Sequence, residues 1–169
     1  MSFTRIAAAT VVALASFVVA TGHAAQGAPN TPNTPNEPNE PNELRWGPAP
    51  AVFPPGAQMA VLAGDPSKAE PFTVRLRFPD GYRIMPHTHP TDEHVTVISG
   101  TFRVGMGEHF RSEGMLTLPR GGFVTAPAGH AHYAAARGAT VVQVHAVGPF
   151  ALTYVNPADL PVAARGGGR

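Results

Sequence analysis

The sequence contains no cysteine at all. Without cysteine the protein cannot form a disulfide, cannot use a thiol nucleophile and cannot carry lipid on an N-terminal cysteine. Disulfide-stapled folds, cysteine-dependent catalysis and bacterial lipoproteins are thereby excluded. The core must hold together through burial of apolar side chains alone.

Charge of either sign is also scarce, with 12 basic and 11 acidic residues in 169. Arg5 is the only charged residue among residues 1–25, so a chain that loses this segment keeps 11 basic residues and 11 acidic ones. Such a balance creates no field that would attract phosphate backbones or anionic lipid. We therefore expect no nucleic acid partner and no membrane partner for the mature protein.

Two common catalytic signatures are missing as well. No glycine-rich run precedes a helical pattern, so there is no loop of the kind that cradles phosphate. Ser99 does not stand in the glycine-flanked elbow of serine hydrolases. Catalysis by this chain would need a different kind of centre.

The N-terminal segment, residues 1–25, has the composition of a secretory signal. One basic residue, Arg5, precedes an apolar run over residues 6–20, and small residues follow at positions where cleavage after Ala24 or Ala25 would fit. A transmembrane anchor is the alternative, but the run is short for a bilayer core. The segment predicts a periplasmic or secreted protein.

Residues 26–43 differ from everything that follows, because Pro-Asn-Thr and Pro-Asn-Glu triplets repeat there with almost no apolar side chains. Proline at every third position favours an extended, solvated chain, so we expect a disordered linker. A dedicated binding motif is the alternative. Residues 161–169, which end in three glycines and an arginine, are expected to be a flexible tail rather than an RNA-binding element.

Between these ends, residues 44–160 predict a single all-β domain. Apolar and polar residues alternate over residues 72–78, which gives a strand one buried and one solvated face. Similar patterns predict further strands at 94–99, 101–106, 123–126, 140–147 and 150–155. Glycine-containing turns are expected between them at 100, 107–108, 121–122, 137–138 and 148–149. Many short strands without helices favour a sandwich or barrel.

Seven of the eight histidines follow residue 86. His87 and His89 lie two residues apart in an extended stretch, so both imidazoles project from one face and can meet one ion. Glu93 begins the next strand, in which Val95 and Val97 share its inward face while His94 points outward. A pair of histidines that binds nothing is the alternative interpretation.

Two spaced blocks surround these residues. The first block runs Gly81-x5-His87-x-His89-x3-Glu93-x6-Gly100. The second block runs Gly121-x5-Pro127-x-Gly129-x2-His132. Together they resemble the two motifs of the cupin superfamily, over about 52 residues. The resemblance implies a double-stranded β-helix, the cupin jelly-roll barrel, and one divalent metal ion held by His87, His89, Glu93 and His132. One position departs, because Ala136 stands where the second motif commonly has asparagine.

The resemblance names a fold and no single reaction, since cupins include dioxygenases, isomerases and non-catalytic binding proteins. Three imidazoles and a carboxylate suit manganese, iron, cobalt, nickel, copper or zinc. We expect a metal-dependent enzyme, a dioxygenase or related oxidoreductase, acting on a small organic substrate in the barrel. The alternative is a non-catalytic module that binds or senses a metal or small ligand. Cupins commonly pair, so a homodimer is expected.

The remaining candidates are less well placed. His130 shares parity with His132 and is expected either beside the substrate or at the rim. His145 lies opposite the all-apolar face of its strand, which is expected to line the barrel, and His109 lies in a turn region, so both are expected away from the ion. Arg83 has the parity of His87, but Pro86 interrupts the stretch, and we expect exposure. Aromatic residues of the strands are expected in the core.

Overall fold

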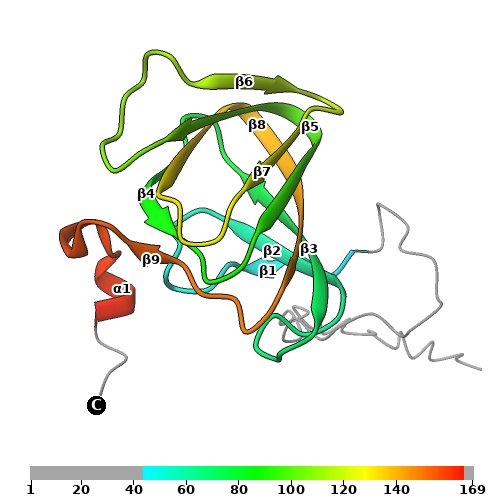
Figure 1. Ribbon diagram of the computed structural model, residues 1–169. Helices are drawn as coiled ribbons and strands as arrows, with labels where there is room; N and C mark the ends of the chain where they lie inside the picture. The colour runs from blue at the N-terminus through cyan, green and yellow to red at the C-terminus, as the bar shows by residue number, and fades with distance from the viewer. Residues whose placement is uncertain (1–43, 166–169) are drawn as a thin grey trace, which may run out of the picture.

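The computed structural model describes residues 44–165, and the predicted signal, residues 1–25, and linker, residues 26–43, lie outside the described residues. Figure 1 shows a curled sheet, followed by short helical turns near the end of the described chain. The strands are β1 (Gly47–Pro48), β2 (Gln58–Ala63), β3 (Pro71–Phe78), β4 (Arg83–Thr88), β5 (Glu93–Met106), β6 (Leu116–Pro119), β7 (Phe123–Ala126), β8 (His132–Val147) and β9 (Thr153–Tyr154). The helical turns are η1 (Pro157–Asp159) and α1 (Val162–Arg165). This is the predicted all-β fold, a double-stranded β-helix.

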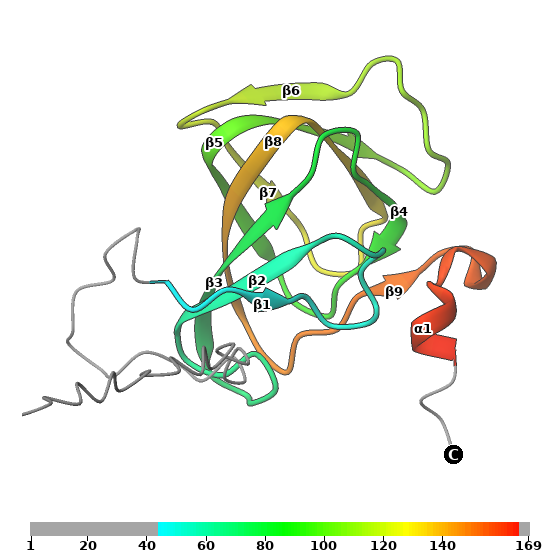
Figure 2. The same ribbon diagram turned by 180° about the vertical axis from the view of Figure 1, so that it is seen from behind.

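The sheet is wound around the two longest strands, β5 and β8. One path of hydrogen-bonded neighbours runs β1-β2-β3-β8-β4-β9, and β5 pairs with β6, β7 and β8. The first half of β8 lies between β4 and β5, whereas its second half lies between β3 and β5. Each long strand therefore belongs to two layers of the barrel, as the view from behind in Figure 2 makes visible.

The bends in these long strands correct two sequence expectations. Turns were expected at Gly100 and at residues 137–138, but β5 and β8 continue through both places. The pairing of β5 with β8 shifts register around Ser99, and Gly100 and Gly138 both have positive φ angles, 78° and 72°. Glycine adopts this conformation at little cost, so the strands bend there without ending.

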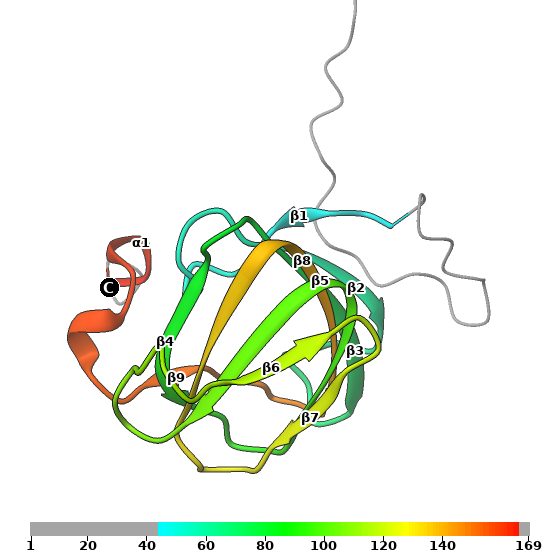
Figure 3. The same cartoon turned by 90° about the horizontal axis from the view of Figure 1, so that it is seen from above.

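Other strand predictions are confirmed in part. Strand β3 has the expected alternation, with Phe72, Val74, Leu76 and Phe78 all buried. Strand β7 has the predicted bounds, whereas only Thr153–Tyr154 of the predicted 150–155 strand pairs with a neighbour. The view from above in Figure 3 shows β5 and β8 side by side in the wall of the barrel, with β6 and β7 next to β5.

The inward faces of the strands form one apolar core. It includes side chains from β3, β5 and β8, among them Phe78, Val97 and Val142, each 1% exposed. Three ionisable side chains are buried in this interior, because His87, His89 and His132 are each only 3% exposed. Buried imidazoles in an apolar interior require polar partners, and these define the candidate site.

Candidate metal centre

His87 lies near the end of β4, and His89 follows directly after this strand. The pairing of β4 with β8 shifts register between Ile84 and His87. Because of this shift, Ile84 and His87 both face the interior although their positions differ by an odd number. Arg83 consequently does not share the inward face of His87. It is exposed, with its guanidinium 5.3 Å from the centre of the Phe110 ring. The expected exposure of Arg83 is confirmed.

His132 meets the pair from the neighbouring strand. It is the first residue of β8 and is the direct Cα partner of His87 in the β4–β8 ladder. The ring centres are 4.3 Å apart for His87 and His132, 5.1 Å for His89 and His132, and 4.9 Å for His87 and His89. One possible ligand atom from each imidazole lies within 4.8 Å of those of the other two. The three imidazoles could therefore hold one metal ion between them.

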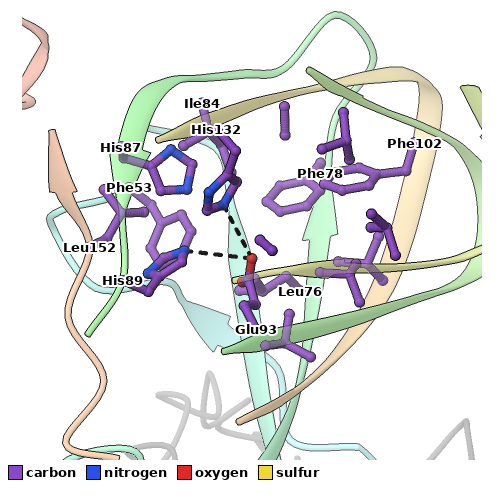
Figure 4. A pocket seen from close by; sticks show the side chains of 17 residues that line it. Phe53, Leu76, Phe78, Ile84, His87, His89, Glu93, Phe102, His132 and Leu152 are labelled. Atoms are coloured by element: carbon purple, nitrogen blue, oxygen red, sulfur yellow. Dashed lines mark ion pairs between the residues drawn. The ribbon is translucent and has the colours of Figure 1, made fainter. Parts of the chain in front are cut away.

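Glu93 faces this histidine cluster from the start of β5. Its Oε2 atom lies 3.5 Å from Nε2 of His89 and 3.5 Å from Nε2 of His132 (Figure 4). Val95 and Val97 are buried on the same face of β5, while the neighbouring His94 points outward. Glu93 thus lies beside His89 and His132, and all four side chains singled out by the sequence line the same cavity.

Backbone carbonyls fix the orientation of all three imidazoles. Nδ1 of His87 lies 2.7 Å from the Met85 carbonyl oxygen, and Nδ1 of His89 lies 2.8 Å from that of Ala151. Nδ1 of His132 lies 3.1 Å from the carbonyl oxygen of His130. A carbonyl only accepts, so each Nδ1 carries the proton and donates it, and each Nε2 keeps a free lone pair. This is the arrangement that holds metal-binding histidines in place.

The Nε2 atoms of His89 and His132 are buried and have no hydrogen-bond partner. The contacts of 3.5 Å to Glu93 are too long to replace one. Leaving a buried acceptor without a partner costs about 1–3 kcal/mol, so an apolar interior rarely contains such atoms without a reason. A cation that accepts both lone pairs supplies that reason, and the donor set therefore fits a bound metal ion.

Burial also sets the protonation of these groups. Desolvation, together with the neighbouring imidazoles of His132 and His89, lowers the pKa of His87 to about 3. At neutral pH His87 is thus a neutral imidazole, the form that binds metals.

The space around the four side chains is small and apolar. Its volume is about 30 Å³, enough for one or two water molecules. All the other described side chains that line it are apolar, including Leu76, Phe78 and Phe102 from the barrel wall. Phe53 and Leu152, which sequence analysis did not single out, stand near His87 and His89 in Figure 4.

The other histidines lie outside the centre. His130 is exposed at the rim, but its carbonyl orients His132, so it contributes through its backbone. His145 is exposed and bonds Thr73, as expected from the polar face of its strand. His109 is exposed in the loop after β5. The carbonyl of Ala151 could not have been anticipated, because it lies 62 residues from His89 along the chain.

The curled all-β barrel with inward histidines is that of a cupin, and the chain is a member of the cupin superfamily. Residues 54–157 match the family described as a domain of unknown function, DUF4437, and the chain belongs to this cupin-like family. No curated protein matches the sequence.

Several solved structures share the fold. The polyketide cyclase RemF from Streptomyces resistomycificus is 12% identical, with a TM-score of 0.61 over 74% of this chain and 89% of the other. A candidate acetylacetone dioxygenase from Methylibium petroleiphilum PM1 is 22% identical, with a TM-score of 0.58 over 77% and 88%. An RmlC-like cupin from Shewanella frigidimarina NCIMB 400 is 15% identical, with a TM-score of 0.52 over 66% and 90%. At these identities the likeness concerns the fold.

Proposed function

We propose that this protein is an exported cupin that holds one divalent transition metal ion through His87, His89, Glu93 and His132. One observation carries the proposal. Three imidazoles with fixed Nδ1 protons turn toward one point, and two of their Nε2 atoms are buried without partners. Glu93 adds a carboxylate oxygen 3.5 Å from both of those atoms.

The donor atoms and the apolar wall of the centre determine which metal it favours and what that metal could do. The strands preassemble the ligands, so little reorganisation accompanies binding. Three nitrogen donors and one carboxylate favour manganese, iron, cobalt, nickel, copper or zinc over calcium and magnesium. When bound, such an ion supplies Lewis acidity or redox chemistry at a substrate oxygen. The apolar wall around Phe78 and Phe102 keeps bulk water from that substrate.

The reaction we propose is an oxidation of a small organic molecule, as in a dioxygenase or related oxidoreductase. An ion held by these four residues could supply the redox chemistry for oxidation of a substrate by dioxygen. A fold shared with a candidate acetylacetone dioxygenase is consistent with this reaction. An isomerase would use the same centre without dioxygen.

A second candidate, a non-catalytic module that binds or senses a metal or small ligand, is favoured by a different observation. Among the described residues lining the centre, no acid or base stands beside the four ligands. Proton transfer to or from a substrate would then depend on a ligand or on water. The two candidates share the metal and differ in turnover.

Elemental analysis of the purified full chain tests the metal. We expect about one transition metal ion per chain in the native protein and in a His94→Ala control, and less than about a tenth of that in His132→Ala. Equal metal content in all three proteins would reject the centre. Dioxygen consumption across a panel of small organic substrates then separates the dioxygenase or related oxidoreductase from the binding module, which would show ligand-induced thermal shifts without turnover.

Export and pairing are separate parts of the proposal. Export predicts a mature N-terminus near Ala24 or Ala25, which N-terminal sequencing of protein from a periplasmic or culture fraction would detect. Pairing predicts a mass near twice that of one chain by light scattering; a monomer at micromolar concentration would rule it out. No helix within residues 44–165 is long and apolar enough to span a bilayer.

A further inference from the structure

A second cavity, about 300 Å³ in volume, lies directly beside the metal centre. Its walls come mainly from β2 and β3, the loop before β2 and the segment between β8 and β9, and Pro66, Glu93 of β5 and Val144 of β8 complete them. Met59, Phe72, Val74 and Phe150 line it and do not line the centre itself. The volume is about twice that of a cavity known to admit benzene, at about 150 Å³.

The two cavities share a boundary. Glu93, Phe53, Leu76 and Leu152 line both of them. The ring of Phe150 stacks on His89, with ring centres 4.3 Å apart and an interplanar angle of 22°. A molecule in the larger cavity, which we name the apolar chamber, would therefore have one end at Glu93, the candidate metal ligand that lines both cavities. The centre itself has room for little more than the reacting atoms.

The chamber selects against charge. Among the described residues that line it, Glu93 is the only one with an ionisable side chain, and no lysine or arginine is present. An anionic group would lose its hydration there without gaining a cationic partner. A cationic group would meet the positive charge of the ion that Glu93 and the histidines hold. The remaining lining consists of aliphatic and aromatic side chains, proline and one alanine.

We propose that the substrate or ligand of this protein is an uncharged, mainly apolar organic molecule, whose body lies in the apolar chamber and whose single polar end faces Glu93. This inference rests on the proposed function, because it assigns the ligand class of the same metal centre. It excludes sugars, phosphorylated compounds and amino acids, which carry charge or hydroxyl groups that the chamber cannot satisfy.

A matched pair of fluorescent probes tests the ligand class. N-phenylnaphthylamine is uncharged, and anilinonaphthalenesulfonate carries a sulfonate on the same aromatic framework. Titrating each into the full chain, both metal-loaded and chelator-treated, should show the uncharged probe binding at least about tenfold more tightly. Met59→Trp and Val74→Phe, which fill the chamber from two strands, should each weaken that binding at least about tenfold. Leu116→Trp, on exposed β6, should leave it unchanged.

Metal content and circular dichroism are measured on the same samples. Retained metal with lost probe binding in both filled variants supports the chamber. Equal affinity for both probes, or undiminished binding in folded filled variants, overturns it while the metal centre stands. If the protein retains no metal but still binds the uncharged probe more tightly, the proposed function is rejected while the proposed ligand class is supported. A change in oligomeric state in the filled variants, with no change in probe binding, makes the cavity an interface between copies and overturns the proposal.

Discussion

Gly100 shows how one residue permits the bend of β5. Its φ angle is +78°, and a Cβ atom there would lie 2.8 Å from the Cα atom of Thr140 on β8 and in conflict with the Ala139 carbonyl. Thr140 is fully buried and bonds Thr101 across this corner. A side chain at Gly100 therefore meets both a backbone penalty and a steric one.

We predict that Gly100→Ala lowers the free energy of unfolding by about 3 kcal/mol or more. Gly121 is the matched control, because its φ angle is +82° but a Cβ atom there has nothing within 4 Å. Gly121→Ala should cost only the backbone term, about 1–2 kcal/mol. Urea unfolding of the two variants measures the difference, and equal losses would show that the contact with β8 adds nothing.

Glu93 supplies the only negative charge among the described residues lining the metal centre. We predict that Glu93→Gln, which keeps the shape and removes the charge, weakens metal binding by about tenfold or more. Isothermal titration with manganese measures the change. Asp92→Asn is the control, since Asp92 is exposed and bonds the amide of Ala128 instead. An unchanged manganese affinity in Glu93→Gln would show that Glu93 is not a metal ligand.

At the scale of elements, two tyrosines tie the loop before β2 to the barrel. The Tyr82 hydroxyl donates to the Pro54 carbonyl at 2.6 Å, and the Tyr154 hydroxyl donates to the Val52 carbonyl at 2.9 Å. Phe53 lies between these two anchors and lines both the centre and the apolar chamber. The tyrosines thus position one wall of the proposed site.

Tyr82→Phe should lower the free energy of unfolding by about 1 kcal/mol at neutral pH, because one buried hydrogen bond is lost. Burial, and then the charge of Tyr154, raise the pKa of Tyr82 above its usual value of 10.0. A raised pKa stabilises the fold below pH 10, and this stabilisation is lost as pH rises toward the folded-state pKa. The difference between wild type and Tyr82→Phe should therefore shrink above pH 10 in urea unfolding. A constant difference up to pH 11 would contradict this.

Much of the barrel and all four inward side chains could be predicted, for identifiable reasons. The alternation of apolar and polar residues over β3 indicates which face is buried, and the spacing of the motif glycines and histidines indicates where the site lies. The bends of β5 and β8 were missed because glycine marks turns and bends alike. The parity expected for Arg83 and His87 was wrong because the irregularity in β4 depends on pairing with β8. The apolar chamber depends on contacts between strands distant in sequence, which no local pattern encodes.

For the whole molecule, the candidate ligands join three strands. His87 lies near the end of β4 and His89 directly after it, Glu93 opens β5 and His132 opens β8, so a bound ion would tie these strands together at one end of the barrel. A ligand that binds only the folded state stabilises it by mass action, by about 2.7 kcal/mol at a concentration 100 times its dissociation constant. For a chain of this size that corresponds to roughly 5–10 °C in melting temperature.

We therefore predict that saturating manganese raises the melting temperature of chelator-treated protein by roughly 5–10 °C. His94→Ala, which changes an outward-facing histidine beside Glu93, should respond as the wild type does. His132→Ala should respond by less than about 2 °C, because a centre that has lost one of four donors binds the ion far more weakly. Differential scanning calorimetry measures all three proteins under one set of conditions. Since His94 and His132 differ in the direction their side chains point and not in residue type, an equal response from both variants would mean that the ion binds elsewhere on the chain.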